Sequence, residues 1–463
     1  MKSGICIILG GVIFCLNLQA QFKDYDLSTY KLPDLKRHQL DLLLNLSGNY
    51  SNHWDHLTDT VGRRLLNNNN VGFNPIYNFY RNSENYQGSL TSTFGLRIAS
   101  NTLKDSGNIV IDKERGISEN FNINSENRFY LKRKLFIESN VQIRNSYFVN
   151  KREHETENAL NPYKSKQKIT SQSISTSAEL LIGTGRIEPV QDMRLALYIL
   201  EELQKANRLK RIPTEAEINE FARLISTLRN ERFFDNRLKR VHELEQLDTF
   251  LVSKSLISDY DATHFAIIMD NWDYAKGPNR SAGWRISTGI GEYVAWNLAK
   301  RTYWTNNLID NNMKSKFTNS QLIGIVKFNY AKPINLYWQL DFGSQFSVGK
   351  NMQGEDKIFV MDSSATTYLS FDPFCTVGYY PNSRSNYIVN LSGNYYNWID
   401  KDYNFGLNLN ISGNYYISQQ VRLNFAIIPS FVFRDVESRS LSSYGYNNGF
   451  DCSVYATFTY SIL

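Results

Sequence analysis

The sequence predicts an all-β fold: a transmembrane antiparallel β-barrel of about 14 strands, uncertain by about two, with an inserted α-helical domain. Three observations support this. Aromatic residues make up 14% of the 463 residues and charged residues only 21%, a combination that excludes intrinsic disorder. Many segments alternate apolar and polar residues with the period of two that strands show. The connections between these segments are alternately short and long, which is typical of barrels in outer membranes.

The alternation is clearest over residues 402–417. There Leu407 and Leu409 alternate with Asn408 and Asn410, so the two sets lie on opposite faces of a strand. In a membrane barrel the apolar set meets lipid and the Asn set lines the lumen, whereas in a soluble sandwich the apolar set meets a core. The alternating runs cover about 13 to 16 residues, longer than most strands of globular proteins, which favours the barrel over the sandwich.

A second alternating segment, residues 335–348, predicts which side chains contact lipid. The expected lipid-facing residues are Leu336, Trp338, Leu340 and Phe342. The opposite faces of the strands supply the expected lumen-lining residues, which are Arg97, Lys327, Asp341, Asn408, Asn410 and Arg422. Because the charged members include more cations than carboxylates, the pattern predicts a slight preference for anions at physiological salt.

The same pattern predicts strands on both sides of one interruption. Six strands are expected within residues 21–186 and eight within 283–463, the two halves of the barrel. The expected strands are 38–52, 70–81, 86–100, 117–131, 134–150, 166–185, 283–301, 317–331, 335–348, 366–380, 385–398, 402–417, 420–436 and 448–463. Longer polar loops are expected near 53–69, 101–116, 151–165, 302–316, 349–365 and 437–447. The even number places both ends of the sheet in the periplasm.

Residues 1–20 have the composition of a secretory signal peptide. Lys2 precedes an apolar stretch, and Ala20 is the expected residue before cleavage. The apolar stretch is shorter than the roughly 20 residues that a membrane-spanning helix needs, which argues against a single anchoring helix. No other long apolar run occurs, so a bundle of membrane helices is excluded.

Cleavage would leave two cysteines, Cys375 and Cys452, which lie on separate expected strands. Two cysteines are too few for a disulfide framework, so we expect two unpaired thiols rather than one bridge. The formal net charge of the whole chain is +6, and the charges are scattered. A charge this small and dispersed argues against nucleic acid as a partner.

The interruption at residues 187–282 has a helical period instead. Residues 190–206 carry apolar side chains at helical spacing, and a second helix is expected to begin at a capping box formed by Thr214 and Glu217. A third is expected over 231–252, with an apolar stripe of Phe234, Leu238, Val241, Leu244, Leu247 and Leu251. By the strand count this domain is periplasmic. It would plug the lumen, bind a periplasmic or cell-wall partner, or simply pack beneath the barrel.

Two groups of polar residues have the composition of weak metal sites. The first group, which follows the third expected helix, contains Asp259, Asp261, His264, Asp270 and Asp273. The second is the His53 and His56 pair, expected in an external loop. Neither has the spacing of a known calcium or zinc motif, so ordinary capping and turn chemistry is the preferred interpretation. No catalytic motif occurs, so we expect no enzyme activity, no metal and no cofactor.

The strands and the ends of the chain resemble outer-membrane β-barrel proteins of the Bacteroidota kind. The resemblance rests on Ala20 followed by Gln21, on aromatic and Asn-rich strands, and on the terminal FTYSIL. It implies insertion in an outer membrane, with membrane lipid as a partner. One departure is that the chain ends on Leu463, whereas such barrels commonly end on an aromatic residue.

These observations predict a porin-like passive channel for small polar solutes, with a periplasmic helical domain that gates it or recruits a periplasmic or envelope protein through residues 187–282. The main alternative is a barrel without an open pore that serves as a platform for an envelope assembly. A third alternative is an outer-membrane enzyme that acts on lipid or glycan.

Overall fold

The computed structural model describes most of the chain after the expected signal peptide. The described residues are 22–56, 61–105, 110–132, 134–156, 163–231, 236–257, 262–274, 280–306, 308–354, 366–399, 403–418, 421–435 and 448–460. The expected signal peptide therefore lies outside them. Within the described segments no helix is long and apolar enough to cross a membrane.

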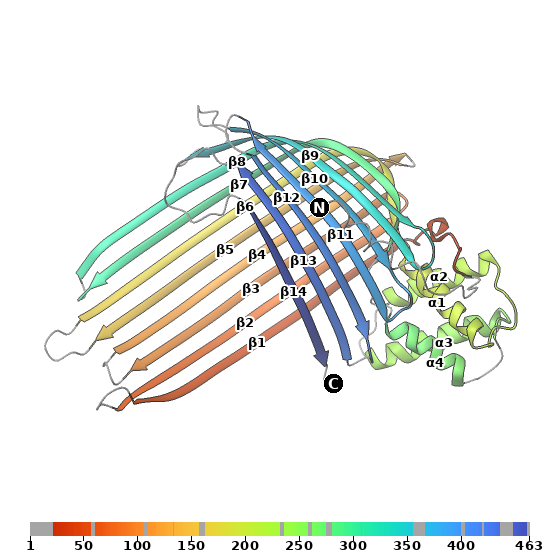
Figure 1. The fold of residues 1–463 in the computed structure, drawn as a ribbon, viewed down its shortest axis with the longest axis horizontal. Coiled ribbons are helices and arrows are strands. Elements are labelled where there is room, and N and C mark those ends of the chain that lie inside the picture. The colour runs from red at the N-terminus through yellow and green to blue at the C-terminus, as the bar shows by residue number, and fades with distance from the viewer. Residues whose placement is uncertain are drawn as a thin grey trace, which may run out of the picture.

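Fourteen strands form one antiparallel sheet in which each strand pairs with its neighbours in the sequence (Figure 1). The strands are β1 (Leu35–His56), β2 (Val61–Ser83), β3 (Tyr86–Asp105), β4 (Val110–Lys132), β5 (Leu135–Thr156), β6 (Tyr163–Pro189), β7 (Ser281–Thr305), β8 (Leu308–Pro333), β9 (Trp338–Gly354), β10 (Thr366–Tyr379), β11 (Ser385–Trp398), β12 (Tyr403–Tyr416), β13 (Val421–Asp435) and β14 (Asn448–Tyr460). The predicted fold class and the predicted number of strands are therefore confirmed.

The sheet is strongly staggered. A row of directly paired residues that starts at Leu35, the first residue of β1, ends at Arg434, the residue before the last of β13. The row passes through Asn82, Gln87, Arg128, Glu138, Leu181, Gly289, Ile325, Ser347, Ser370, Tyr396 and Asn404. A fixed stagger of this kind is what a sheet needs to close into a barrel. The sheet curls accordingly, and β9–β14 pass in front of β1–β6 (Figure 1).

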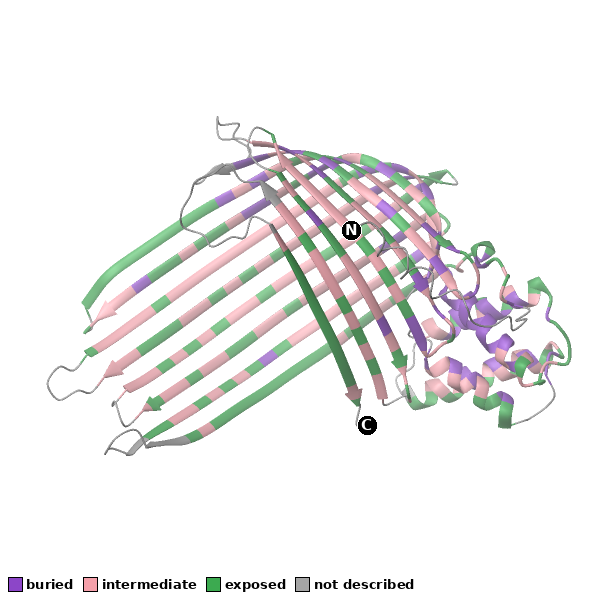
Figure 2. Cartoon of the chain, in the orientation of Figure 1, coloured by how far each residue is buried: buried purple, intermediate pink, exposed green. Residues whose placement is uncertain are grey.

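The two edge strands, β1 and β14, are not paired with each other in the described part of the chain. Both are exposed along most of their length (Figure 2). Exposed sheet edges do not occur in the hydrocarbon region of a bilayer, because their backbone groups would lack hydrogen-bond partners. A membrane-inserted state of this chain must therefore bring β1 and β14 together.

One face of the sheet is apolar and exposed. On β1 the outward residues Leu40, Leu42, Leu44 and Leu46 are 62–69% exposed. The other strands present Val, Ile, Leu and Phe in the same alternate positions, including Phe73, Ile98, Ile117, Ile182, Ile290, Phe346, Phe371, Leu407, Phe425 and Phe458. A continuous apolar surface on this scale would be exposed to water in a soluble protein, whereas a lipid bilayer is a favourable environment for it. The sheet is thus a membrane-spanning one.

The assignment of Leu336 to this lipid-facing surface is wrong. Leu336 precedes β9 and is fully buried in the core of the helical domain. The alternation therefore begins at the next outward residue, Trp338, after a turn that the sequence pattern does not distinguish from strand. Leu340 and Phe342 lie on the outward face beside Val377 and Cys375 of β10.

Most of the expected long loops are also wrong. The regions near 101–116, 151–165 and 302–316 are mostly strand, because β3–β8 extend far beyond a bilayer's width. Polar residues there still pair in ladders, since both faces of a strand can meet water above the membrane. The His53 and His56 segment belongs to the end of β1 rather than to a loop, and the side chains of both residues lie outside the described ones. Most of the remaining expected loops, 349–365 and 437–447, also lie outside the described residues.

Four α-helices form a compact unit between β6 and β7. They are α1 (Gln191–Lys205), α2 (Glu215–Asn230), α3 (Asn236–Ser253) and α4 (Ala262–Asp273). A short 3-10 helix from the segment before β1, η1 (Leu27–Thr29), packs in the same core. The capping box at Thr214 and Glu217 is present. Here the hydrogen bond from Arg211 lowers the pKa of Glu217 to about 2.

Two expectations for this unit are corrected. The stripe of α3 is buried only in its second half, at Leu244, Leu247 and Leu251, whereas Leu238 and Val241 are 55% and 61% exposed. Helix α4 occupies a segment expected to contain turns. Its polar residues are paired: His264 lies 2.6 Å from Asp248, and Asp273 pairs with Arg240. Asp259 and Asp261 are outside the described residues.

Candidate functional site

The concave face of the sheet is polar, and it is the candidate functional surface. The cross-strand register places Arg97, Lys327, Asp341, Asn408, Asn410 and Arg422 on this face. These are the residues expected to line a lumen. Some polar side chains on this inner face are buried. Glu138, Ser287 and Ser347 are 2–3% exposed, in contrast to the apolar side chains of the opposite face.

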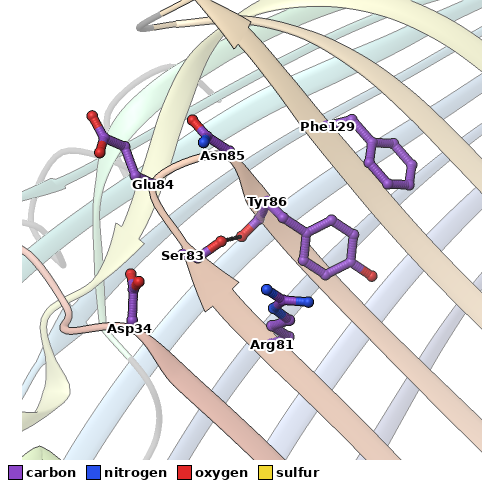
Figure 3. Close-up of a pocket in the computed structure, with 7 residues that line it drawn as sticks. All are labelled: Asp34, Arg81, Ser83, Glu84, Asn85, Tyr86 and Phe129. Atoms are coloured by element: carbon purple, nitrogen blue, oxygen red, sulfur yellow. Dashed lines mark hydrogen bonds between the residues drawn. The ribbon is translucent and has the colours of Figure 1, made fainter.

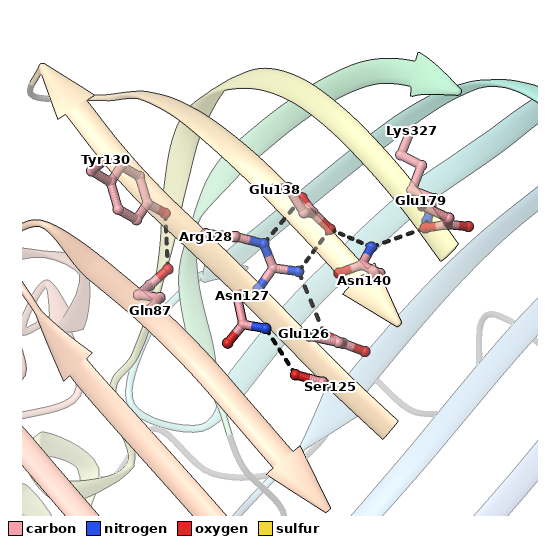
Figure 4. A network of polar contacts seen from close by, with 10 residues as sticks. All are labelled: Gln87, Ser125, Glu126, Asn127, Arg128, Tyr130, Glu138, Asn140, Glu179 and Lys327. Carbon is pink, nitrogen blue, oxygen red and sulfur yellow. Dashed lines mark hydrogen bonds and ion pairs between the residues drawn. The ribbon is translucent and has the colours of Figure 1, made fainter. Parts of the chain in front are cut away.

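A chain of charged and amide side chains crosses this inner face (Figure 4). Arg128 of β4 donates two hydrogen bonds to Glu138 of β5, at 3.1 and 3.2 Å. Asn140 bridges Glu138 and Glu179 through Nδ2, at 2.9 Å to each carboxylate. Lys327 of β8 completes the chain with a 2.6 Å contact to Glu179 of β6. Each carboxylate thus has a cation, so the network places charge on the wall without an unpaired ion.

Glycines on β7 lie beside the last contact. Lys327 and Glu179 come from strands on either side of β7, where their partners in the register are Ser287 and Gly291. Between these two positions on the inner face lies Gly289, where a Cβ would lie 2.1 Å from the carbonyl oxygen of Leu180 on β6. A Cβ on Gly291 would lie 3.2 Å from Cγ of Glu179, so a larger residue there would displace the carboxylate.

The other expected lumen residues are more separate. Arg97 is exposed and donates to Asn70 of β2 at 2.7 Å, about midway along β3. Asp341 accepts a hydrogen bond from Gln339 at 2.6 Å near the helical unit. Arg422 lies against the Tyr416 ring, 5.7 Å from its centroid. The structure therefore does not bring the predicted residues together as one site; they are spread along the inner wall.

The inner face carries both signs of charge. The anions that the sequence pattern left out include Glu126, Glu138 and Glu179, and all three lie in or beside the network of Figure 4. These carboxylates offset the inner cations, so the structure does not support the predicted excess of positive charge on the lumen face. Several inner amide oxygens, among them those of Asn140, Asn404, Asn410 and Asn424, are buried and have no hydrogen-bond partner among the described residues. Asn408, in contrast, is exposed on this face and can offer its amide group to a polar solute.

Arg280 anchors the helical unit to the sheet. Its side chain is fully buried and donates to the carbonyls of Asn335 and Trp338, at 2.7 and 2.8 Å, and to that of Leu336. It also donates to Oε1 of Gln339 at 3.2 Å. Burial lowers the pKa of Arg280 to about 10, so the side chain stays charged at neutral pH. One guanidinium thus binds three backbone carbonyls in and beside the β8–β9 turn.

Further contacts join the helices to the next turns of the sheet. Tyr198 of α1 donates a 2.6 Å hydrogen bond to the carbonyl of Tyr380, and burial raises the pKa of Tyr198 to about 12. Asp270 of α4 pairs with Arg384 in the β10–β11 turn. The ring of Tyr274 lies 5.3 Å from that of Tyr416 at the end of β12. The helical unit therefore spans the turns at one end of the sheet (Figure 1).

The segment before β1 is part of the same unit. Phe22, Leu27 and Tyr30 are buried in the helical core, and Tyr30 donates to the carbonyl of Ala222 of α2 at 3.4 Å. Since this segment leads directly into β1, the helical unit is fixed at both sides of the sheet: beside β1, and at the turns that follow β8, β10 and β12.

A shallow pocket lies outside the sheet at the same end (Figure 3). It is lined by Asp34, Arg81, Ser83, Glu84, Asn85, Tyr86 and Phe129. The Arg81 guanidinium lies 5.6 Å from the centroid of the Tyr86 ring, and the Tyr86 hydroxyl donates to Asn127 at 2.6 Å. Aromatic rings with polar tips beside an apolar surface are typical of a membrane–water interface. We interpret this pocket as part of the aromatic girdle.

The fold can be compared with solved structures. One similar structure is the translocator domain of the autotransporter NalP from Neisseria meningitidis, with a TM-score of 0.24, 10% identity, and coverage of 82% of this chain and 86% of that one. Two structures of the RagAB peptide transporter are also similar, with TM-scores of 0.35 and 0.34 and identities of 8% and 7%. They cover 86% and 83% of this chain, which spans about half of theirs. No family model matches, and no curated protein matches.

The chain has the fold of an outer-membrane β-barrel protein. This follows from the staggered, all-antiparallel sheet, its apolar outer face and its polar inner face.

The sequence did not predict the charged network on the inner face, nor the role of Arg280 in holding the helical unit on the sheet. Glu138, Glu179 and Arg128 occupy inward positions of strands that were predicted, but their pairing depends on the register between strands. Arg280 had no sequence signal, because its acceptors are carbonyls of a turn more than 50 residues away.

Proposed function

We propose that the chain is a porin-like passive channel for small polar solutes, restricted on the periplasmic side by its helical unit. The observation that carries the proposal is the continuous polar inner face, with ion-paired charges, opposite a lipid-facing outer surface. Side chains fill the interior of 8-stranded barrels, whereas 16-stranded porins leave an aqueous channel. A closed barrel of 14 strands falls between these cases.

The position of the helical unit supports a restricting role. It is attached to the segment before β1 and to the turns after β8, β10 and β12, so it extends across the mouth of a closed barrel. Apart from the helical unit, every connection at this end is a short turn, whereas the two longest connections, after β9 and after β13, lie at the other end. Barrels in outer membranes have their short turns in the periplasm and their long loops outside. The proposal assigns no catalytic step and no cofactor to the chain.

Because the inner charges are mostly paired, we expect small conductance steps with little ion selectivity. Full-length protein in planar bilayers tests this. Replacing Arg384→Gln together with Tyr337→Phe removes contacts of the helical unit with two turns and should enlarge the steps. Deletion of residues 190–280 should enlarge them further. A matched control is Lys254→Gln, which breaks the pair with Glu220 on the same unit without touching a turn.

The second candidate is a non-conducting platform for an envelope assembly. It is favoured by exposed apolar side chains on the helical unit, namely Ile212, Leu238, Val241 and Phe265, each 44–61% exposed. Such side chains are typical of a surface that binds a protein partner. If neither the full-length protein nor the deletion conducts, although both fold as barrels, the channel proposal fails and the platform replaces it.

A further inference from the structure

A row of basic side chains lies on the outward face of the sheet, at the end remote from the helices. Arg115 of β4 is paired with Lys151 of β5, which in turn is paired with Lys168 of β6. All three are exposed. A further basic pair, Lys300 and Lys314, faces outward on β7 and β8. The positive charges are thus aligned across neighbouring strands.

This arrangement opposes the stability of the sheet. Like charges directly opposite each other on one face of an antiparallel pair are destabilising. Two nearby outward carboxylates already have partners, because Glu153 lies 3.7 Å from Lys166 and Glu155 lies 2.9 Å from Lys164. A third, Glu119, lies four residues along β4 from Arg115, beyond Ile117, and is not paired with the row. In the described part of the chain, Arg115, Lys151 and Lys168 have no ion pair. The row is therefore suited to an anion supplied from outside the protein.

The row adjoins the apolar surface. On β4 the outward residue next to Arg115 is Ile117, which is 45% exposed, and on β5 the outward residue next to Lys151 is Val149. A hollow beside the row is lined by Lys151, Arg152, Glu153, Lys166, Gln167, Lys168 and Trp304. Aromatic and cationic side chains at the edge of a lipid-facing surface lie at the level of the lipid headgroups.

We propose that Arg115, Lys151 and Lys168 bind the phosphate groups of a phosphorylated glycolipid in the external leaflet of the outer membrane. The acyl chains of such a lipid would pack on the apolar face below, at Ile117 and Val149. A soluble anion would gain nothing from that neighbouring surface, which favours a lipid. Neighbouring strands are about 4.8 Å apart, so the three cations span roughly 10 Å, enough for more than one phosphate. This inference rests on the membrane orientation in the proposed function, but not on conduction.

The test measures lipid binding by the full-length protein in detergent. The probes are a glycolipid with two phosphate groups and the same lipid after phosphatase treatment, each quantified by native mass spectrometry. We expect the phosphorylated form to bind preferentially. Replacing Arg115→Gln, Lys151→Gln and Lys168→Gln together should weaken this binding roughly 100-fold. The matched control replaces Lys36, Lys132 and Lys332, three exposed lysines at the helical end, with Gln and should bind as the unchanged protein does.

Four results would overturn the proposal: equal binding of both lipids, equal binding by the triple variant, an equal loss in the control, or full displacement by inorganic phosphate at a concentration equal to that of the lipid. A gel-mobility shift between heated and unheated samples verifies that each variant is a folded barrel.

A second experiment tests the orientation of the row. Lys168→Cys, in a Cys375→Ser and Cys452→Ser background, is treated on intact cells with a membrane-impermeant thiol reagent. Absence of labelling would also overturn the proposal. Conductance measured on the triple variant separates the two proposals, since a protein that does not conduct can still bind the lipid.

Discussion

Replacing Arg280→Met should detach the helical unit from the sheet and destabilise it by about 3 kcal/mol or more. The guanidinium is fully buried and donates to three backbone carbonyls and to Gln339, and methionine fills similar space without any donor. Each buried acceptor left without a partner costs about 1 to 3 kcal/mol. Denaturant titration should show the unit unfolding at lower denaturant concentration while the barrel remains folded.

The control for this prediction is Lys254→Met. Lys254 pairs with Glu220 on the surface of the same unit, so its removal should cost about 0 to 1 kcal/mol. If Arg280→Met and Lys254→Met unfold at the same denaturant concentration, Arg280 is not the anchor. Limited proteolysis between α2 and α3 provides a second measurement, because a detached unit should be cut faster.

Replacing Phe342→Arg should destabilise the barrel by about 2 to 4 kcal/mol, the cost of a cation near the middle of the bilayer. Phe342 is 37% exposed, faces outward near the middle of the apolar part of β9, and lies 4.8 Å from the Tyr330 ring. Leu340→Arg, nearer the turn at the helical end, should cost less because an arginine there can reach the headgroups.

Refolding into lipid vesicles at increasing urea concentration measures both changes. The matched control is Lys350→Arg, which keeps a cation on the outward face beyond Val348 and should have no effect. Equal stability of Phe342→Arg and Lys350→Arg would show that Phe342 does not contact hydrocarbon.

The number of strands and their inner and outer faces could be predicted because both depend on local alternation. Leu407, Leu409, Asn408 and Asn410 reveal their faces within a single strand. The ends of the strands could not be predicted in the same way. Beyond the membrane both faces of a strand meet water, so the polar ends of β3–β8 look like loops although they pair in ladders.

The helical unit was predictable where a local signal existed. The capping box of Thr214 and Glu217 marked the start of α2 correctly. Helix α4 was missed because it is short and carries Asp270 and Asp273, whose partners, Arg384 and Arg240, lie elsewhere in the sequence. Leu336 was misplaced because the contacts that bury it come from a different unit of the fold. The inner network likewise depends on the register between strands, which a single sequence does not reveal.

The most direct test of the account is whether β1 and β14 pair in the membrane, since a lumen exists only if the sheet closes. Cys452 of β14 faces outward and is a free thiol, and Cys375 can be replaced by Ser. Single Cys substitutions at the outward β1 positions Leu42, Leu44, Leu46 and Gly48 then scan for a disulfide with Cys452. Such a bond needs Cα atoms within about 7 Å, as in paired strands. The account predicts an intramolecular bond at one or two adjacent outward positions and none at the inward Leu43, whereas no cross-link at any outward position would contradict it.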